Sequence, residues 1–108
     1  MAVPLYQSKA EFFRTLGHPA RIRILELLAD RDHAVHELLE QISIGSSNLS
    51  QQLAVLRRAA LVDSRRDNGE VIYSISAPEV RDLLMIARRI LTDLGGEHRV
   101  LVAEEGWA

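Results

Sequence analysis

Apolar side chains recur every three or four residues along most of the chain, and short polar breaks separate the periodic segments. This spacing is typical of helices that bury one face. Before residue 61 the pattern predicts four helices, at 8–16, 19–29, 35–42 and 46–59. The last two are joined by a few polar residues that include Gly45, which is the outline of a helix-turn-helix. Any helical hairpin has this outline, so it does not by itself identify a function.

Two local signals mark the ends of the first helices. Ser8 and Glu11 have the spacing of a capping box, which predicts that the first helix begins at Ser8. Pro19 suits the first turn of the second helix, and His18 before it is expected to serve as a cap or a packing residue.

After residue 60 the pattern becomes that of a β-hairpin followed by a long helix. Residues 61–66 and 70–76 predict two strands, and Asp67-Asn68-Gly69 between them is a strong turn signal because these residues tolerate positive φ. Residues 77–94 predict a last helix with a broad apolar stripe. A small domain can bury only part of such a stripe, so we expect the rest to pack against a second copy, unless the stripe is wholly intramolecular.

The expected fold is mostly α with a small β-hairpin, in the order helix, helix, helix, helix, strand, strand, helix. This is a winged helix-turn-helix. At 108 residues the chain fits one domain, residues 1–108, with a core at about 8–95 and a tail at 96–108. No apolar run is long enough to cross a bilayer and no signal peptide is recognisable, so we expect a cytoplasmic protein without a membrane partner. The absence of cysteine excludes disulfides and thiolate metal sites.

The outward face of the fourth helix carries the candidate chemistry. With Leu49 at the centre of the buried face, Leu53, Leu56 and Ala60 fall on the same side. The opposite side starts with short polar side chains and ends with arginine, which suits the major groove of DNA. We expect base contacts from Ser47, Asn48 and Gln51, and phosphate contacts from Ser46, Ser50, Gln52, Arg57 and Arg58. A solvated polar helix face is the alternative.

Basic residues also flank the tip of the hairpin. If the hairpin is a DNA-binding wing, phosphates or the minor groove would be contacted by Arg65, Arg66 and Asn68. A hairpin with a purely structural role could carry the same residues. Net charge does not separate these alternatives, because the whole chain has a formal charge of −2.

Candidate metal ligands are few. His33 and His36 are three residues apart, Glu37 follows, and His98 lies near the C-terminus. Groups from two chains could combine into a nitrogen and oxygen site suited to nickel or zinc. The alternative is that these histidines are exposed surface residues, and the fold requires no cofactor.

Six stretches of the chain together have a specific order and spacing, although no single one is decisive. These stretches are Leu16-Gly17-His18-Pro19-Ala20-Arg21-Ile22-Arg23-Ile24-Leu25, Val35-His36-Glu37-Leu38, Ser47-Asn48-Leu49-Ser50-Gln51-Gln52-Leu53-Ala54-Val55-Leu56, Ala60-Leu61-Val62, residues 65–73 and the final helix. Through them the chain resembles the ArsR/SmtB family of winged-helix repressors over about residues 8–95. The resemblance implies a homodimer, formed through the first and last helices, that represses an operon and releases its double-stranded DNA operator when an effector binds.

The family's metal sites match poorly. The cysteine-containing box on the third helix is replaced by a stretch in which only His36 and Glu37 could ligate. The last helix has Asp82 and Asp93 but no histidine before His98. The effector could therefore be a metal, a small molecule or a partner protein.

Two other classes of function remain to be weighed. An enzyme is not expected, because the chain has no glycine-rich phosphate loop, nucleophile elbow or evident carboxylate pair. A winged-helix protein-interaction module without DNA binding is the main alternative to a repressor.

Overall fold

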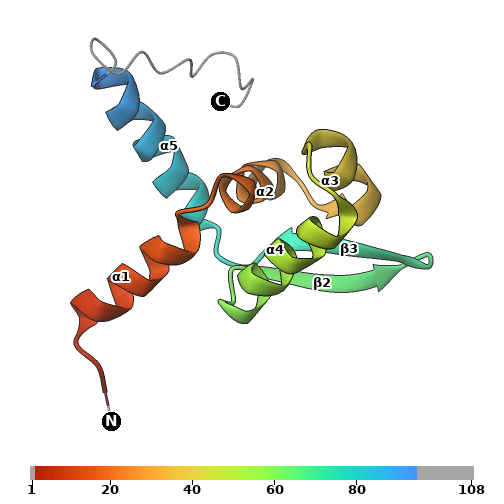
Figure 1. Ribbon diagram of the computed structural model, residues 1–108, viewed down its shortest axis with the longest axis horizontal. Coiled ribbons are helices and arrows are strands. Elements are labelled where there is room, and N and C mark those ends of the chain that lie inside the picture. Colours follow the sequence, from red (N-terminus) through yellow and green to blue (C-terminus); the bar gives the residue numbers. More distant parts are fainter. Residues whose placement is uncertain (1, 95–108) are drawn as a thin grey trace.

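The computed structural model describes residues 2–94, which form five helices and a three-stranded sheet (Figure 1). The elements in chain order are α1 (Leu5–Leu16), α2 (Pro19–Asp30), β1 (His33–Ala34), α3 (Val35–Gln41), α4 (Ser46–Arg58), β2 (Val62–Asp67), β3 (Glu70–Ile75) and α5 (Glu79–Asp93). The expected winged helix-turn-helix is confirmed. The predicted tail at 96–108, and with it His98, lies outside the described residues.

Helix α1 begins three residues earlier than its sequence predicts. Leu5 follows Pro4, whose φ of −58° suits a helix start, and Ser8 lies inside the helix. The predicted capping box is therefore wrong: Pro4 stands at the cap position, and Glu11 is paired with Arg14. The apolar and polar residues between Pro4 and Ser8 have ordinary helix propensities, so nothing local prevents the helix from extending back to the proline.

The core lies where α2, α3 and α4 meet the sheet and the start of α5. Leucines from the three central helices are almost completely inaccessible, and they include Leu25, Leu38, Leu49 and Leu56. The apolar positions predicted for α4 point into this core because the 3.6-residue period brings every third or fourth side chain to one face. Burial of one face fixes the rotation of α4 and determines which side chains it exposes.

A short strand that periodicity did not predict joins the hairpin to a sheet. In β1, His33 pairs with Tyr73 and Ala34 pairs with Ile72, so the antiparallel strand order is β1-β3-β2. Two residues are too few to show an alternating pattern, and their partners lie about forty positions later in the chain. The predicted hairpin turn is confirmed, since Asn68 and Gly69 have φ of 51° and 79° between the paired Asp67 and Glu70.

Helix α4 ends before Ala60, which was expected on its buried face. The amide of Leu61 donates to the carbonyl of Leu56 at 3.0 Å and that of Ala60 donates to Arg57 at 3.0 Å, which is a Schellman motif. This motif places Ala60 in the left-handed region with φ of 61° and exposes it. The prediction that Ala60 lies on the buried face was therefore wrong, because α4 ends at Arg58 and the chain turns away from the helix before Ala60.

Helix α5 has a buried beginning and an exposed end. Val80 and Leu84 are buried in the core, whereas Ile86, Ile90, Leu91 and Leu94 are exposed. Helices α1 and α5 extend from one side of the molecule, and the β2–β3 hairpin extends from the opposite side (Figure 1). No helix among residues 2–94 is long and apolar enough to cross a membrane.

Candidate nucleic-acid interface

The N-terminal half of α4 presents a row of exposed polar side chains. Leu49 and Leu53 hold the helix against the core with 0% and 2% exposure. The residues around the outer side are consequently open to solvent, and those predicted to contact DNA are Ser46, Ser47, Asn48, Ser50 and Gln51. The helix begins directly after Gly45, and none of these serines caps it through its side chain. The first backbone amides and hydroxyl groups are thus available to an external partner.

Gln52 departs from the sequence prediction, which placed it against phosphate. Its side chain is buried, with 8% exposure, between α4 and α2. The Oε1 atom accepts a hydrogen bond from Arg21 Nε at 2.8 Å, and Nε2 donates to Asn48 Oδ1 at 2.9 Å. The predicted phosphate contact of Gln52 is therefore corrected to a role in the interior. Sequence periodicity places Gln52 at the edge of the buried face, and only the position of Arg21 decides that it is enclosed.

Helix α4 and strand β3 line an open hollow. It has a volume of about 440 Å³ and is lined by Ser50, Ala54, Arg57, Arg58 and Tyr73. The two arginines lie in the last turn of α4 and are exposed, as predicted. Tyr73 is a residue that the sequence interpretation missed, because its alternation in β3 indicated only packing. A hollow with two guanidinium groups and two hydroxyl groups suits a phosphate group.

The hairpin presents its two arginines differently. Arg65 Nη1 lies 2.8 Å from Asp32 Oδ2, so its charge is balanced by the segment before β1. Arg66 is exposed at the next position, and Asn68 is exposed at the turn. An exposed ion pair such as Arg65–Asp32 contributes only about 0–1 kcal/mol, which is weak enough for phosphate to replace the carboxylate.

The two neighbouring histidines do not form a common site. His33 is buried, and its Nδ1 lies 2.8 Å from the Arg31 carbonyl oxygen. The interpretation of His33 as an exposed surface residue was therefore wrong, since it is buried in β1, where it pairs with Tyr73 of β3. His36 is exposed on α3, with Nε2 2.9 Å from Glu70 Oε1 and Nδ1 3.9 Å from Glu40 Oε1. Within residues 2–94, no three histidine or acidic side chains are placed to hold a metal ion.

Glu37 stabilises the start of α3. Its Oε1 atom accepts a hydrogen bond from the Ala34 amide at 2.8 Å, and Oε2 lies 3.4 Å from Arg31 Nη2. The Ala34 amide is the largest influence and lowers the pKa of Glu37 below its usual value of 4.5, with a smaller lowering from Arg31. Both of its oxygens are thus engaged within its own chain rather than presented as metal ligands.

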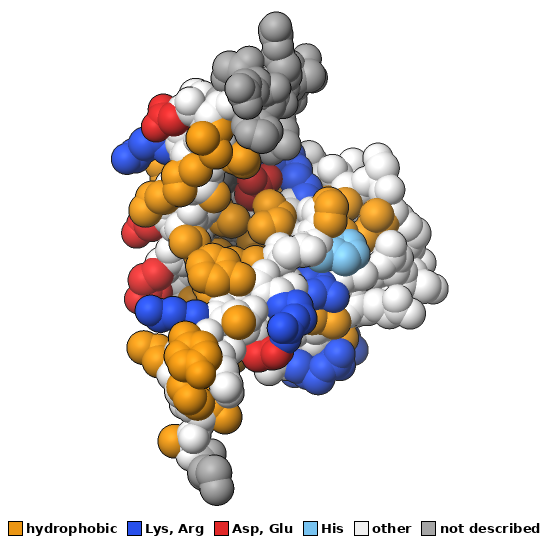
Figure 2. Space-filling model, turned by 60° about the vertical axis from the view of Figure 1, so that its left-hand side comes forward, with side chains coloured by type: hydrophobic (Ala, Val, Ile, Leu, Met, Phe, Trp, Pro, Cys, Tyr) orange, Lys and Arg blue, Asp and Glu red, His pale blue; other side chains and the backbone are white. Residues whose placement is uncertain are grey.

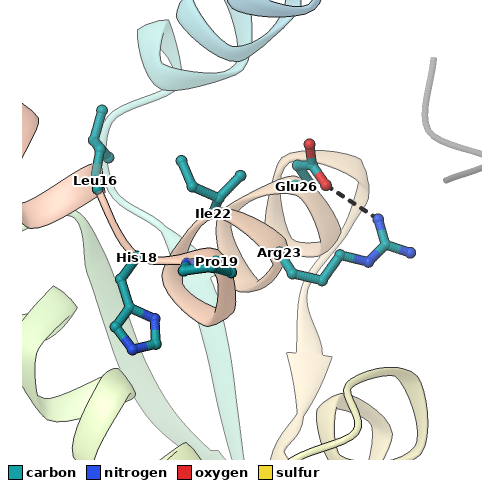
Figure 3. A pocket seen from close by; sticks show the side chains of 7 residues that line it. Leu16, His18, Pro19, Ile22, Arg23 and Glu26 are labelled. Carbon is teal, nitrogen blue, oxygen red and sulfur yellow. Dashed lines mark hydrogen bonds and ion pairs between the residues drawn. The ribbon is translucent and has the colours of Figure 1, made fainter. Parts of the chain in front are cut away.

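A second hollow lies where α1 meets α2. It has a volume of about 600 Å³, and its lining includes Leu16, His18, Ile22 and Glu26. Figure 3 shows the side chains of Leu16, Ile22 and Glu26 on one side of α2, whereas His18 points the other way. His18 caps α2 as expected, since its Nδ1 accepts from the Ala20 amide at 3.1 Å.

Comparisons with known proteins agree with this architecture. The model of the family described as bacterial regulatory protein, arsR family, matches residues 18–64, which run from the His18 cap through the helix-turn-helix into β2. The regulator Rv0081 of Mycobacterium tuberculosis, described as an uncharacterized HTH-type transcriptional regulator, is 57% identical over 103 residues, covering 94% of this chain and 90% of the relative.

Solved structures extend the agreement to the whole fold. The crystal structure of M. tuberculosis Rv0081 has a TM-score of 0.80 at 55% identity and covers 92% of this chain and 100% of that chain. The transcriptional repressor BigR from Xylella fastidiosa has a TM-score of 0.74 at 33% identity, covering 79% and 87%. The homodimeric winged helix-turn-helix DNA-binding domain Mb0332 from Mycobacterium bovis, titled a possible ArsR-family regulator, has a TM-score of 0.71 at 26% identity, covering 87% and 86%.

The solved relatives share the overall fold of this chain, and the descriptions name transcriptional regulators rather than enzymes. Identity above one half along nearly the entire chain is far beyond what a shared fold requires. The chain therefore belongs to the arsR family of bacterial regulatory proteins and is a DNA-binding transcriptional regulator.

Proposed function

We propose that this protein is a homodimeric repressor that places α4 in the major groove of an inverted-repeat operator and blocks transcription by occupying it. The observation that carries this proposal is the exposed polar row on the N-terminal half of α4, flanked by Arg57, Arg58 and the hairpin. The major groove accepts one helix, and its N-terminal residues usually contact the base edges. The name of BigR as a repressor supports the same mode of action.

Each part of this surface has a distinct role in the proposal. Base edges are contacted by Ser47, Asn48 and Gln51, because they are exposed and can both donate and accept hydrogen bonds. Phosphates are contacted from α4 and from the hairpin, and the residues that do so are Ser46, Ser50, Arg57, Arg58, Tyr73, Arg65, Arg66 and Asn68. Arg65 would exchange Asp32 for phosphate on binding. The proposed roles require access to the chromosome, so we expect the protein to act in the cytoplasm.

The dimer is proposed to form through α1 and α5. Figure 2 shows hydrophobic side chains gathered along both helices on one side of the molecule. The exposed large hydrophobic residues of the described chain lie in these two helices or just before α1, and they are Val3, Leu5, Tyr6, Phe13, Ile86, Ile90, Leu91 and Leu94. A contiguous apolar patch of this kind marks an interaction surface. A second copy of the chain is the favoured occupant, because the related domain Mb0332 is homodimeric. Two-fold symmetry would place the α4 helices about 34 Å apart, one turn of DNA.

An effector is proposed to release the operator. A metal such as nickel or zinc is one candidate, and a small molecule and a partner protein are two others. No three-ligand group exists among residues 2–94, so a metal would need ligands from two protomers or from a residue beyond them, such as His98.

A fluorescence-anisotropy titration tests the proposal. The purified protein is titrated against labelled DNA from upstream of its own gene and against a shuffled duplex, at two salt concentrations and with or without nickel or zinc. A repressor binds its own upstream DNA more tightly, and its affinity falls steeply with salt because phosphate contacts release counterions. Weaker binding with metal would identify a metal effector, and indifference would direct the search to another inducer. Equal binding to both duplexes would contradict a sequence-specific repressor, and no binding to either duplex under any condition would favour the protein-interaction module instead.

A further inference from the structure

Three polar side chains form a hydrogen-bonded chain from the end of α1 to the outer face of α4. Arg21 in α2 donates through Nη1 to the Thr15 carbonyl at 3.2 Å and through Nε to Gln52 Oε1 at 2.8 Å. Gln52 Nε2 then donates to Asn48 Oδ1 at 2.9 Å. Gln52 is buried, whereas Asn48 is exposed on the surface proposed to enter the groove. The hydrogen-bonded chain therefore runs from the half-buried guanidinium group of Arg21 to an exposed side chain on the surface proposed to bind DNA.

The chemistry of arginine sets the direction of every bond in this chain. A guanidinium group has only donors, so the atom of Gln52 that faces Arg21 has to be the amide oxygen. The amide nitrogen of Gln52 then faces Asn48, and the Asn48 atom that meets it has to be an oxygen as well. Turning either amide over would place a donor against a donor. Arg21 thus fixes the orientation of both amides, because it can only donate hydrogen bonds.

We infer that Arg21 and Gln52 hold Asn48 with its amide nitrogen directed at the DNA, so that Asn48 selects a base that presents a hydrogen-bond acceptor. An unconstrained asparagine can both accept and donate and pairs most readily with adenine. Here the oxygen is turned toward Gln52, from which it accepts a hydrogen bond, so the two N–H groups on the other side of the amide remain for the base. Guanine, adenine and thymine each offer an acceptor in the major groove, but cytosine offers only a donor. Cytosine is therefore the base that Asn48 excludes.

This inference rests on the proposed placement of α4 in the major groove and adds a specificity rule to it. Gln52 and Arg21 act as positioning residues, since they do not reach the DNA themselves. Gln51, the neighbouring exposed amide on α4, is outside this three-residue chain and can turn either way to suit a base. The rule is thus specific to one position in each half of the operator.

The substitution Gln52→Glu reverses the polarity of Asn48 without removing the contact with Arg21. Both carboxylate oxygens accept, so one would pair with Arg21 and the other would accept from the Asn48 amide nitrogen. Asn48 would then turn its oxygen toward the DNA and select the donor of cytosine or adenine. The buried charge is balanced by Arg21, so the variant is expected to fold.

Selection of binding sites from a random duplex library measures this reversal directly. The wild-type protein is expected to exclude cytosine by about tenfold at one position in each half-site. Gln52→Glu is expected to enrich cytosine or adenine at that same position. Gln41→Glu, which makes the same change of charge at an exposed site at the end of α3, controls for electrostatic effects and should select the wild-type sequence.

A second variant guards against misfolding of the first. Asn48→Asp still accepts from Gln52 but has no N–H for the base, so it too should stop excluding cytosine, and its exposed position makes unfolding no concern. Identical base profiles for the wild type and both variants would overturn the polarity rule while leaving the proposed repressor intact. Selection of no common sequence by the wild-type protein would instead overturn the repressor and the rule together.

Discussion

At the scale of single residues, Gln51 and Arg66 stand for the two kinds of DNA contact in the proposed complex. Gln51 lies on the outer side of α4, and Arg66 lies on the hairpin. We expect Gln51→Ala to change the base preference at one position, at a cost of about 1–3 kcal/mol for the preferred site. Arg66→Ala should weaken every duplex alike and reduce the salt dependence by about one phosphate contact. Anisotropy titrations against the preferred and shuffled duplexes separate the two effects, and unchanged binding by both variants would place the interface elsewhere.

Glu37 gives a prediction about pH. The Ala34 amide lowers the pKa of Glu37 in the folded protein, so its ionised form stabilises the fold above the pKa of the unfolded chain. That contribution is lost as the pH falls below about 4.5 through the lower pKa of the folded state. We expect Glu37→Gln to lower the free energy of unfolding at neutral pH and to flatten its decrease over this acid range.

Urea unfolding of both proteins across this pH range provides the measurement. Glu40→Gln, one turn along α3, removes the same charge without touching the bond to Ala34 and is the matched control. If Glu37→Gln and Glu40→Gln had the same pH dependence, the capping interaction would not be the source of the acid sensitivity.

At the scale of elements, the end of α4 carries a local strain that a glycine would relieve. Ala60 adopts φ of 61° to complete the Schellman motif, a conformation that costs a residue with a Cβ atom about 1–2 kcal/mol. Glycine loses part of this gain because its unfolded chain is more flexible. We therefore expect Ala60→Gly to increase the free energy of unfolding by about 0.5–1 kcal/mol in urea denaturation.

The neighbouring residue offers a control for this prediction. Ala59 has φ of −80° at the end of the same helix, so Ala59→Gly gains nothing from relief of strain and should destabilise the protein. Equal effects of the two substitutions would show that the left-handed conformation of Ala60 carries no measurable strain.

The elements themselves could largely be predicted from the sequence, whereas some of their ends could not. The apolar spacing in α4 and the Asn68–Gly69 turn depend on neighbours within a few residues, so local rules were sufficient. The start of α1 at Leu5 and the exit of the chain at Ala60 depend on small competing preferences, which periodicity does not resolve.

At the scale of the whole molecule, the exposed apolar sides of α1 and α5 are expected to hold two protomers together. Ile90 is 54% exposed on α5. Ile90→Glu would place a charge in the proposed interface, so the dimer should dissociate. If both half-sites have to be bound at once, the affinity for the operator should then fall by at least about tenfold. Sedimentation velocity measures the oligomeric state, and anisotropy measures the affinity.

Thr92→Glu is the matched control for the dimer. It adds the same charge to the same helix, but two residues correspond to about 200° of rotation, which places Thr92 on the other side of α5. This variant should remain dimeric. A dimeric Ile90→Glu variant would contradict the proposed interface, and two monomeric variants would point to a general loss of stability in α5.

The sequence by itself determined the order of the helices, the hairpin turn and the polar outer face of α4, since each follows from the spacing of residues close together in the chain. Only the tertiary structure decided the burial of His33 against β3, the enclosure of Gln52 by Arg21 and the pairing of Arg65 with Asp32. These partners lie about thirty or forty positions apart, and no local pattern encodes which distant side chain will arrive opposite a given residue. The interior contacts of Gln52 therefore set how Asn48 is presented, although the sequence had already marked Asn48 as exposed.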